Sequence, residues 1–434
     1  MDENLVETEF KYSHGEINTP FSFVKTMISM FPPQFLRENN KWLDPGCGQG
    51  NISLMLFNSL LKHHNKDEII QEMLHMVEIN AERENTIRAR FNNNTHLNLH
   101  MGDFMDYKSD NFDAIICNPP FNFGGGIKTP TNTANAKKND GFTAWCEFIK
   151  HSVSLLREGG YLCIIVPSMW LKPDKAGMYY YLLNYKIEKM RFYTNTETNQ
   201  IFKGQAQTPT TLFLLKKEQT QHKFLSLFCN KKREYIEYKL NKDYPIPMTN
   251  IGLVNRFMQY VDKVGCLKVF KTNMPSKHTK FSDTKTDVFC YKNIKTVITA
   301  KNENPNTFST MGNVIAEKHI NWSDKPCIGH NKQKIILAHK MYGYPLFDIH
   351  GEYGISNRDN YIITDYNEVE LEQISKFLSL PFIINIYDAT RYRMKYLEKY
   401  AFQFIPDITK LQDFPLTDIS EETVKSYFKI NDLL

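Results

Sequence analysis

The residues with the clearest chemical potential are Asn118, Pro119, Pro120 and Phe121, which directly follow the apolar run 114–117. The Asn118 side-chain oxygen and the Pro119 backbone carbonyl are hydrogen-bond acceptors, and the two prolines restrict the backbone that carries them. Such a pair can hold both hydrogens of an exocyclic amine such as adenine N6 and localise its lone pair, which the ring otherwise delocalises. Phe121 can stack on a base that has left its duplex. The tetrapeptide predicts group transfer to that amine without a metal, a nucleophilic cysteine or a strong general base.

A glycine-rich turn lies upstream, after a short apolar strand and before a helix-like stretch. In an open α/β sheet this is where nucleotide-like ligands bind, because the chain turns sharply there and its backbone can approach the ligand. The spacing is GxGxG and an acid precedes it, which favours a ligand with a cationic amino-acid part over a pyrophosphate. The alternative is a structural turn that binds nothing. For a ligand site, the contacting residues are expected to be Asp44, Pro45, Gly46, Cys47, Gly48 and Gly50.

Two further acids follow the next two predicted strands. Glu78 and Ile79 come at the end of the strand 74–78, where a carboxylate can accept hydrogen bonds from both hydroxyls of a ribose. Asp103 and Phe104 follow the third strand, where the acid can accept from an adenine amine. Either acid can instead be a solvated group at a strand end. We expect these residues to contact a nucleoside cofactor.

In order and type, these motifs resemble those of the amino-methyltransferases, specifically the adenine-N6 DNA methyltransferases of the γ arrangement found in restriction-modification systems. The resemblance covers about residues 16–216 and includes Thr19 and Pro20, which fit the upstream segment that contacts the methionine part of the cofactor in that family. It implies S-adenosylmethionine as the cofactor, without a metal. It also implies N6 of a flipped adenine in double-stranded DNA as the methyl acceptor, and a separate restriction endonuclease as a further partner.

The elements that must position these residues alternate between short apolar strands and amphipathic helices, which is typical of a largely parallel sheet with helices on both faces. We expect helices at 21–31, 51–64, 81–91 and 145–156, and strands at 74–78, 97–100, 114–117, 161–166 and 210–215. The predicted fold class is α/β and Rossmann-like, and the resemblance makes it a seven-stranded S-adenosylmethionine methyltransferase domain. The βαβ rhythm ends near Lys216. We therefore place the catalytic domain at 1–216 and a mixed α+β target-recognition domain, which binds DNA, at 217–434.

The second half carries most of the residues expected to bind DNA. Between 268 and 301 there are eight lysines and two aspartates, with aromatic residues between them, and such lysines suit phosphate contacts. Within this stretch, we expect Lys277 and Lys280 to bind DNA. A second basic and aromatic cluster contains Arg391 and Arg393, whose guanidinium groups suit bidentate contacts to guanine. The alternative for the lysines is a solvated face of the protein.

Further DNA contacts are expected in the first half. The segment 124–140 is rich in Gly, Thr, Asn and Lys and is expected to be a mobile loop over the active site. Lys128, Lys137 and Lys138 can hold a phosphate there beside the extruded base, although a disordered loop with incidental lysines is the alternative. Phe202 is expected to be a second residue that stacks on the base.

The overall composition limits the class of protein. At 434 residues, 41% hydrophobic and 13% aromatic, the chain is long enough for two domains and is globular rather than disordered. Its eight cysteines do not have the spacing of a zinc site, and neither a signal peptide nor a long apolar run is present. We therefore expect an intracellular protein with reduced thiols and no membrane segment. The net charge of +5 favours a polyanionic partner only where lysines are concentrated.

Other functions can use the same tetrapeptide. Enzymes that methylate amines of structural RNA, or glutamine in release factors, also carry it, but they need little beyond the catalytic domain. The long second half of this chain favours DNA. A different class is a DNA-binding module that keeps the fold and has lost the chemistry, against which the complete set of Asp44, Glu78 and Asn118 argues.

Overall fold

The computed structural model describes residues 17–109, 111–125, 140–175, 177–221, 223–299, 316–339, 345–358, 360–393 and 397–433. The chain forms two compact units. The first unit comprises Met1–Pro245 with Tyr392–Met394, and the second comprises Ile246–Arg391 with Lys395–Leu434. None of the described helices is long and apolar enough to cross a membrane.

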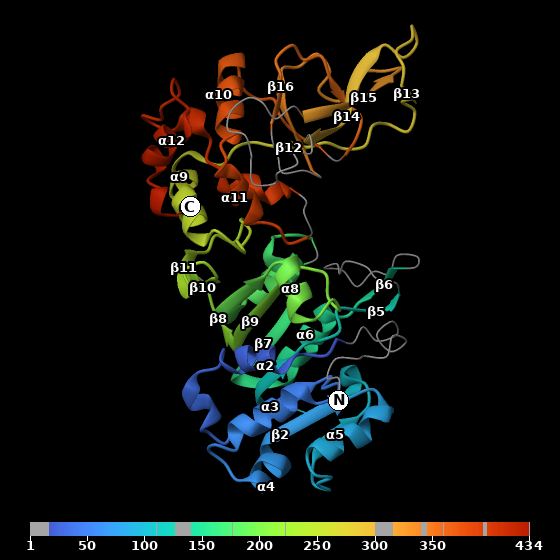
Figure 1. Ribbon diagram of the computed structural model, residues 1–434, viewed down its shortest axis with the longest axis vertical. Coiled ribbons are helices and arrows are strands. Elements are labelled where there is room, and N and C mark those ends of the chain that lie inside the picture. The colour runs from blue at the N-terminus through green and yellow to red at the C-terminus, as the bar shows by residue number, and fades with distance from the viewer. Residues whose placement is uncertain are drawn as a thin grey trace. The chain divides into compact units, whose positions relative to one another are not determined.

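In the described part of the first unit, one nine-stranded sheet has the order β11-β10-β8-β9-β7-β4-β1-β2-β3. Figure 1 labels β2 and β7 to β11 of these strands. Its strands are β1 (Trp42–Pro45), β2 (Leu74–Glu78), β3 (Asn98–Met101), β4 (Phe112–Cys117), β7 (Leu156–Pro167), β8 (Tyr185–Tyr193), β9 (Thr210–Gln219), β10 (Phe224–Cys229) and β11 (Glu234–Lys239). The run β3-β2-β1-β4-β7 is parallel, whereas β9 is antiparallel to both of its neighbours. The expected Rossmann-like α/β class is confirmed.

Two strands extend this sheet beyond the seven that were expected. β10 pairs in parallel with β8 through Leu227 and Met190, and β11 pairs with β10 along its whole length. Because both strands add to the edge of the same sheet, the first unit continues to Pro245 instead of ending at Lys216. The strand β8 was also missing from the sequence-based prediction, since polar and apolar residues are mixed along it without a clear period.

Helices cover both faces of the sheet, as the burial of its central strand shows. The helices of this unit are α2 (Phe21–Ile28), α3 (Asn51–Leu60), α4 (Lys66–Glu68), α5 (Glu84–Arg90), α6 (Trp145–Leu155), α7 (Met178–Leu183) and α8 (Asn195–Ile201). In β4, every side chain from Ala114 to Cys117 is fully buried. Successive side chains of a strand point to opposite faces, so the sheet must be covered on both sides. Ala114 and Ile116 belong to the core cluster that also contains residues of α2 and α3.

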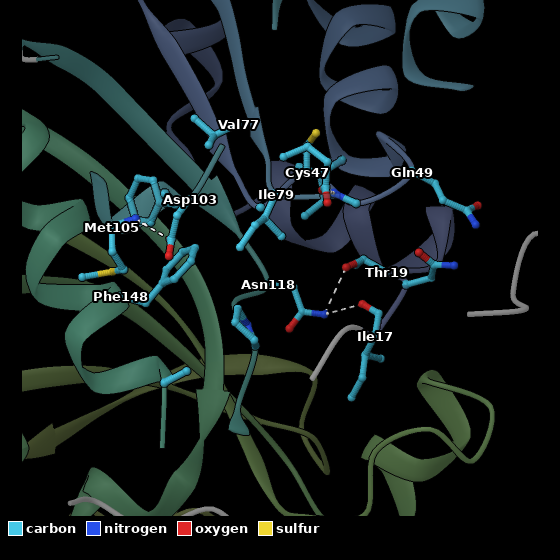
Figure 2. Close-up of a pocket in the computed structure, with 18 of the residues that line it drawn as sticks. Ile17, Thr19, Cys47, Gln49, Val77, Ile79, Asp103, Met105, Asn118 and Phe148 are labelled. Atoms are coloured by element: carbon cyan, nitrogen blue, oxygen red, sulfur yellow. Dashed lines mark hydrogen bonds between the residues drawn. The ribbon is translucent and has the colours of Figure 1, made fainter. Parts of the chain in front are cut away.

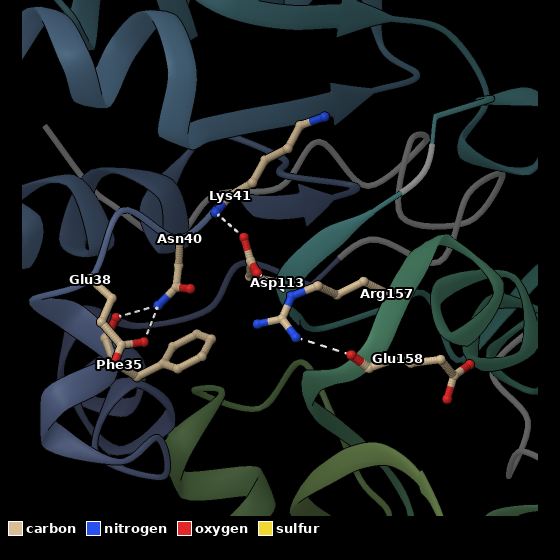
Figure 3. Close-up of polar contacts among 7 residues, drawn as sticks. All are labelled: Phe35, Glu38, Asn40, Lys41, Asp113, Arg157 and Glu158. Atoms are coloured by element: carbon tan, nitrogen blue, oxygen red, sulfur yellow. Dashed lines mark hydrogen bonds and ion pairs between the residues drawn. The ribbon is translucent and has the colours of Figure 1, made fainter.

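At the amino ends of the central strands, Asp113 joins three neighbouring segments (Figure 3). Its Oδ2 accepts a hydrogen bond of 2.7 Å from the backbone N–H of Lys41, just before β1, and its Oδ1 pairs with Arg157 of β7. Asp113 lies at an irregularity in the β4–β7 pairing. Gly160 packs beneath it, where a Cβ would come within 3.0 Å of the backbone oxygens of Phe112 and Arg157. We call Asp113 with its two partners the Asp113 bridge.

The second unit is a mixed α+β structure, as expected (Figure 1). One of its described sheets has the order β12-β19-β16-β17, and another has the order β13-β15-β14-β18. The strands are β12 (Phe270–Lys271), β13 (Phe281–Ser282), β14 (Tyr291–Thr299), β15 (Ala316–Ser323), β16 (Lys334–Ala338), β17 (Leu346–Asp348), β18 (Gly354–Ile355) and β19 (Asn360–Ile363). The helices are α9 (Ile251–Val264), α10 (Glu368–Leu378), α11 (Ile383–Asp388) and α12 (Glu421–Phe428). Aromatic contacts connect helices of this unit. The rings of Phe257 in α9 and Phe428 in α12 stack with centroids 4.6 Å apart.

Candidate active site

A cavity of about 520 Å³ lies at the carboxyl ends of β1, β2 and β4, entirely within the first unit. This volume is in the range of small-molecule sites. The lining residues come from the segment before α2, the glycine turn, the ends of β2 to β4, and α6. They include Thr19, Gly46, Cys47, Gly48, Glu78, Ile79, Asp103, Phe104, Asn118 and Pro120, all of which were predicted to contribute to the site.

The glycine turn adopts a conformation that other residues rarely reach. Gly46, Gly48 and Gly50 have φ values of 71°, 58° and 80°, which is the left-handed region where a side chain is strained. The backbone N–H groups of Gly46 and Cys47 both donate to the Val77 carbonyl at 2.9 Å. The turn is therefore held against the end of β2, with its backbone along the cavity wall.

Asp44 lies behind this turn and not on the cavity surface. Its side chain is fully buried, and its Oδ2 accepts hydrogen bonds from the backbone and the hydroxyl of Ser53 in α3. Its Oδ1 is buried and has no hydrogen-bond partner among the residues that the structure describes. Burial raises the pKa of Asp44 to about 7, against the lowering effect of the Ser53 bonds. Asp44 therefore supports the turn from behind and does not line the cavity, and the cofactor contact expected from the sequence stays a prediction.

Glu78 connects the glycine turn to the cavity. Its Oε2 accepts from the Gly48 backbone N–H at 2.7 Å, and its Oε1 accepts from the Asn80 backbone N–H at 2.8 Å. Burial raises the pKa of this carboxyl, and the two backbone donors oppose that rise. Each carboxylate oxygen has a second lone pair. The Glu78 carboxylate can thus hold the turn and still accept from a ligand hydroxyl.

Asp103 begins the short helical turn Phe104–Asp106, where its Oδ1 accepts from the Met105 backbone N–H at 2.9 Å. Asp103 is exposed and lines the cavity. No hydrogen bond to its Oδ2 is found among the described residues. The geometry leaves an acceptor at the rim, and the predicted contact of Asp103 to an amine stays a prediction.

Apolar side chains form the wall next to Asp103 (Figure 2). The rings of Phe104 and Phe148 pack with centroids 4.5 Å apart, and Ile79 and Met105 keep 45% and 44% of their surface exposed. Large aliphatic side chains this exposed within a cavity can enclose a flat aromatic ligand. An acidic rim beside an apolar slot suits a neutral ring that carries an exocyclic amine.

Asn118 directly follows β4 and has a defined amide orientation. Its Nδ2 donates to the Ile17 carbonyl at 3.3 Å and to the Thr19 hydroxyl oxygen at 3.2 Å. The Ile17 carbonyl can only accept, so it selects the nitrogen of the amide and not the oxygen. Figure 2 shows the Asn118 oxygen turned away from both residues. The acceptor half of the amide is left for a ligand.

The rest of the tetrapeptide is only partly at the cavity. Pro120 lines it, whereas Pro119 is buried and is not among the lining residues. The Pro119 carbonyl has no hydrogen bond within the part of the chain that the structure describes. The Phe121 side chain is 8% exposed and does not line the cavity. The predicted stacking by Phe121 and the predicted acceptance by Pro119 both stay predictions.

Part of the chain that forms this cavity matches a known protein family. Residues 47–202 match the Eco57I restriction-modification methylase family. The match confirms the resemblance for this segment, which we call the methylase segment and which is about a third of the chain. It contains Glu78, Asp103 and the tetrapeptide that begins at Asn118.

Other proteins resemble parts of the chain at low identity or over short stretches. The chain is 30% identical over 96 residues to the ribosomal RNA small subunit methyltransferase A of Prochlorococcus marinus (strain MIT 9301), which is 21% of this chain and 31% of that relative. A type I restriction-modification methyltransferase subunit from Streptococcus thermophilus has a similar structure, with 18% identity, a TM-score of 0.34 and coverage of 50% of this chain and 49% of that one. The DNA-bound Type ISP restriction-modification enzyme LlaBIII also matches, with 14% identity and a TM-score of 0.40. This match covers 52% of this chain and 22% of that one. The chain thus spans less than two thirds of each relative.

Several residues that line the cavity beside the methylase segment's motifs were missed by the sequence analysis. Phe148 and Glu147 come from α6, and Asn51 is the first residue of α3. Phe148 fits the apolar face of an amphipathic helix, so nothing in its spacing separates a cavity residue from a core residue. Asn51 gave a signal that was overlooked, since it is a polar residue directly after the glycine turn. The structure buries it to 5% exposure.

Some predicted contacts are corrected by burial. Phe202 is 2% exposed and packs edge-on against Phe23, with centroids 5.6 Å apart, so it belongs to the core and cannot stack on DNA. Pro20, Pro45 and Gly50 shape the backbone next to the cavity but do not line it. The predicted loop lysines Lys128, Lys137 and Lys138 lie outside the described residues.

In the second unit, the structure distinguishes between the predicted DNA contacts. Lys277 and Lys280 are exposed, and Phe281 keeps 39% of its surface exposed beside them. Arg391 forms an ion pair with Asp388, which occupies part of its guanidinium. Arg393 belongs to the first unit instead, and it is partly buried. The lysine stretch is therefore the better placed of the two clusters for phosphate contacts.

Proposed function

We propose that this chain is an S-adenosylmethionine-dependent DNA methyltransferase that modifies N6 of an adenine extruded from double-stranded DNA. The observation that carries the proposal is the Asn118 amide, whose nitrogen is held by Ile17 and Thr19 and whose oxygen is left beside the cavity (Figure 2). An amine with two hydrogens needs an acceptor of this kind. The match of the methylase segment supports methyl transfer as the reaction.

The residues of the cavity fit the proposed cofactor. Glu78 would accept from the ribose hydroxyls, Asp103 would accept from the adenine amine, and the slot beside Phe104 would hold the adenine ring. The glycine turn would lie against the amino-acid part. Three acids within or behind this wall, at positions 44, 78 and 103, favour a cationic ligand over an anionic one. When bound, the cofactor supplies an electrophilic methyl group.

The chain's own residues would act on the acceptor amine. The Asn118 oxygen and the Pro119 carbonyl would each accept one N6 hydrogen, which draws electron density back to the nitrogen and fixes its direction. The amine loses a proton after the methyl group has been attached, and water can take it. Burial, together with nearby Asp44 and Glu78, raises the pKa of Cys47 well above its ordinary value. Cys47, which lines the cavity, is then a neutral thiol and a poor nucleophile.

The second unit would supply the DNA contacts. Its exposed Lys277 and Lys280 lie beside exposed apolar side chains, Met274 at 61% and Phe281 at 39%. Lysines among exposed aromatic groups suit phosphates and unstacked bases. Since the matched family is one of restriction-modification methylases, a separate restriction endonuclease is part of the proposal.

A methyl-transfer assay with labelled S-adenosylmethionine tests the function. The full chain is offered duplex DNA, structured RNA and a release-factor protein separately, and the modified base is identified after digestion. We expect labelled N6-methyladenine from duplex DNA. Transfer mainly to RNA, which the partial match to a ribosomal RNA methyltransferase makes a relevant comparison, or to protein would refute the proposal.

The Asn118→Ala variant tests the mechanism in the same assay. Removing the side-chain acceptor is expected to lower the transfer rate by roughly 100-fold or more, because the amine then keeps only the Pro119 carbonyl of its two proposed acceptors. The dissociation constant for S-adenosylmethionine is expected to stay within about threefold of the parent value, since the cofactor is held mainly by the wall at Glu78 and Asp103. Equal transfer by Asn118→Ala and the parent would exclude the mechanism.

A further inference from the structure

The amide of Asn118 is the last member of a hydrogen-bond chain that begins outside the cavity. Arg90 Nη1 in α5 donates to Asn51 Oδ1 at 2.7 Å, and Asn51 Nδ2 donates to the Thr19 carbonyl at 3.0 Å. The Thr19 hydroxyl oxygen then accepts from Asn118 Nδ2 at 3.2 Å. Thr19 links the two parts of this hydrogen-bond chain, because its carbonyl accepts from Asn51 and its hydroxyl oxygen accepts from Asn118. Thr19 is only 5% exposed.

An asparagine amide needs such support because its two ends are almost the same size. A half-turn about the last side-chain bond exchanges the oxygen for the NH₂ group at nearly constant volume. With the NH₂ group toward the cavity, Asn118 would present hydrogens to an amine that also presents hydrogens. The acceptors on Ile17 and Thr19 oppose this half-turn, since both contact the nitrogen. Each lost hydrogen bond of this kind changes an equilibrium by up to about tenfold.

The part of the hydrogen-bond chain that runs through Asn51 holds Thr19 itself in place. Asn51 directly follows the glycine turn, is 5% exposed, and lines the cavity. Its bond to the Thr19 carbonyl ties the segment before α2 to the first turn of α3. The segment that orients Asn118 is therefore anchored to the same element that ends the glycine turn.

We infer that Thr19 is a positioning residue, whose hydroxyl oxygen fixes the Asn118 amide with its carbonyl toward the methyl acceptor. This inference rests on the proposed function for the direction of the reaction, and on the hydrogen bonds of Thr19 for the geometry. The sequence resemblance placed Thr19 at the cofactor. The structure assigns its side chain to the catalytic turn.

Three variants of the full chain separate these roles. Thr19→Val keeps the shape of the side chain and removes the acceptor, whereas Thr19→Ser keeps the acceptor. Thr26→Val is the matched control, because Thr26 lies in α2 and its hydroxyl makes no hydrogen bond among the described residues, while valine keeps the backbone carbonyl that accepts from Ser29. Single-turnover methyl transfer is measured with saturating DNA and cofactor, together with the cofactor dissociation constant.

We expect Thr19→Val to lower the single-turnover rate by about tenfold, with the cofactor dissociation constant within about threefold of the parent value. Thr19→Ser and Thr26→Val are expected to stay close to the parent in both measurements. A parental rate for Thr19→Val would overturn the inference. So would a loss that appears only as weaker cofactor binding, or an equal loss in Thr19→Ser, because neither depends on the Asn118 amide.

A second measurement needs no substrate. In NMR spectra of the free protein, the side-chain NH₂ of Asn118 is assigned by its loss in Asn118→Ala, and its hydrogen exchange is compared between variants. Exchange roughly tenfold faster in Thr19→Val than in the parent supports the positioning role, and unchanged exchange overturns it. If the parent transfers no methyl group to DNA, the proposed function fails while this measurement still decides the role of Thr19.

Discussion

At the scale of single residues, burial separates the acids of the site into different tasks. Asp44 is fully buried behind the glycine turn, Glu78 is 3% exposed and holds the turn at its front, and Asp103 is exposed at the rim. A buried carboxylate with an unpaired oxygen is costly in the empty protein. Such a cost is tolerated where a ligand of opposite charge is bound nearby. Asp44, the least accessible of the three acids, is thus the one whose ionisation is expected to cost the most stability.

Asp44 gives a stability prediction with a definite sign. Burial raises its pKa in the folded protein from 3.8 to about 7, so its contribution to stability is present at low pH and is lost as the pH rises through about 7. Asp44→Asn removes this loss. Relative to the parent, we expect the variant to gain roughly 2 kcal/mol in free energy of unfolding between about pH 5 and about pH 8. Urea unfolding of the cofactor-free protein across this range measures the difference.

Ser53→Ala serves as the companion to this variant. Its hydroxyl and backbone N–H lower the pKa of Asp44, and the alanine removes the hydroxyl bond alone. The pH at which the parent loses stability should therefore move upward in Ser53→Ala. Identical pH profiles for the parent and Asp44→Asn would contradict the assignment of this transition to Asp44.

At the scale of elements, the candidate site and a stabilising contact lie at opposite ends of the same strands. The cavity lies at the carboxyl ends of β1, β2 and β4, which is the usual place for ligands in an open parallel sheet. The Asp113 bridge lies at the opposite, amino ends of β1, β4 and β7 (Figure 3). The two regions are at opposite ends of short strands. A change at the bridge should consequently alter stability without reaching the cavity.

Asp113→Ala tests this separation. The variant loses the 2.7 Å bond from the Lys41 backbone N–H and the pairing with Arg157, and leaves the N–H without its charged acceptor. We expect the free energy of unfolding to fall by roughly 1–2 kcal/mol, and the dissociation constant for S-adenosylmethionine to stay within about twofold of the parent. Denaturant unfolding and titration calorimetry measure the two quantities.

Glu158→Ala is the matched control for the bridge. Its side chain is 81% exposed, and its ion pair with Lys217 is long, at 3.6 Å, so its removal should change stability very little. If Glu158→Ala were as destabilising as Asp113→Ala, general charge effects and not the bridge would explain the result.

At the scale of the whole molecule, the proposed function places the chemistry and the DNA contacts in different units. The cavity is formed by residues of the first unit alone, whereas the exposed lysines among apolar side chains belong to the second. Phosphate contacts release bound cations, so DNA affinity should depend on salt concentration and on these lysines. Cofactor binding should depend on neither.

A double variant, Lys277→Ala with Lys280→Ala, measures this division. Two lost phosphate contacts should weaken DNA binding and reduce the slope of log Kd against log salt concentration by roughly 1.8. The cofactor dissociation constant should not change. Lys263→Ala with Lys376→Ala is the control, because it removes the same charge from α9 and α10 of the same unit. Equal slopes for both double variants would argue against a specific DNA contact at Lys277 and Lys280.

What the sequence determined by itself were features that depend on nearby residues. The apolar run before Asn118, the left-handed turn at Gly46 to Gly50, and the strand that ends at Glu78 were all predictable. Strand and turn preferences act over a few residues, so their pattern is visible in the chain. The order of these motifs was also enough to indicate a methyltransferase segment, which the family match confirms over residues 47–202.

Only the tertiary structure decided which atoms are accessible and which are paired. The partners of the Asn118 amide lie 101 and 99 positions away in the chain, Asp44 is covered by α3, and Phe202 is packed against Phe23. An aromatic or acidic residue has the same local pattern whether it is covered or exposed. Its burial depends on contacts between distant segments, and that is why the sequence located the motifs while the fold assigned their side chains to tasks.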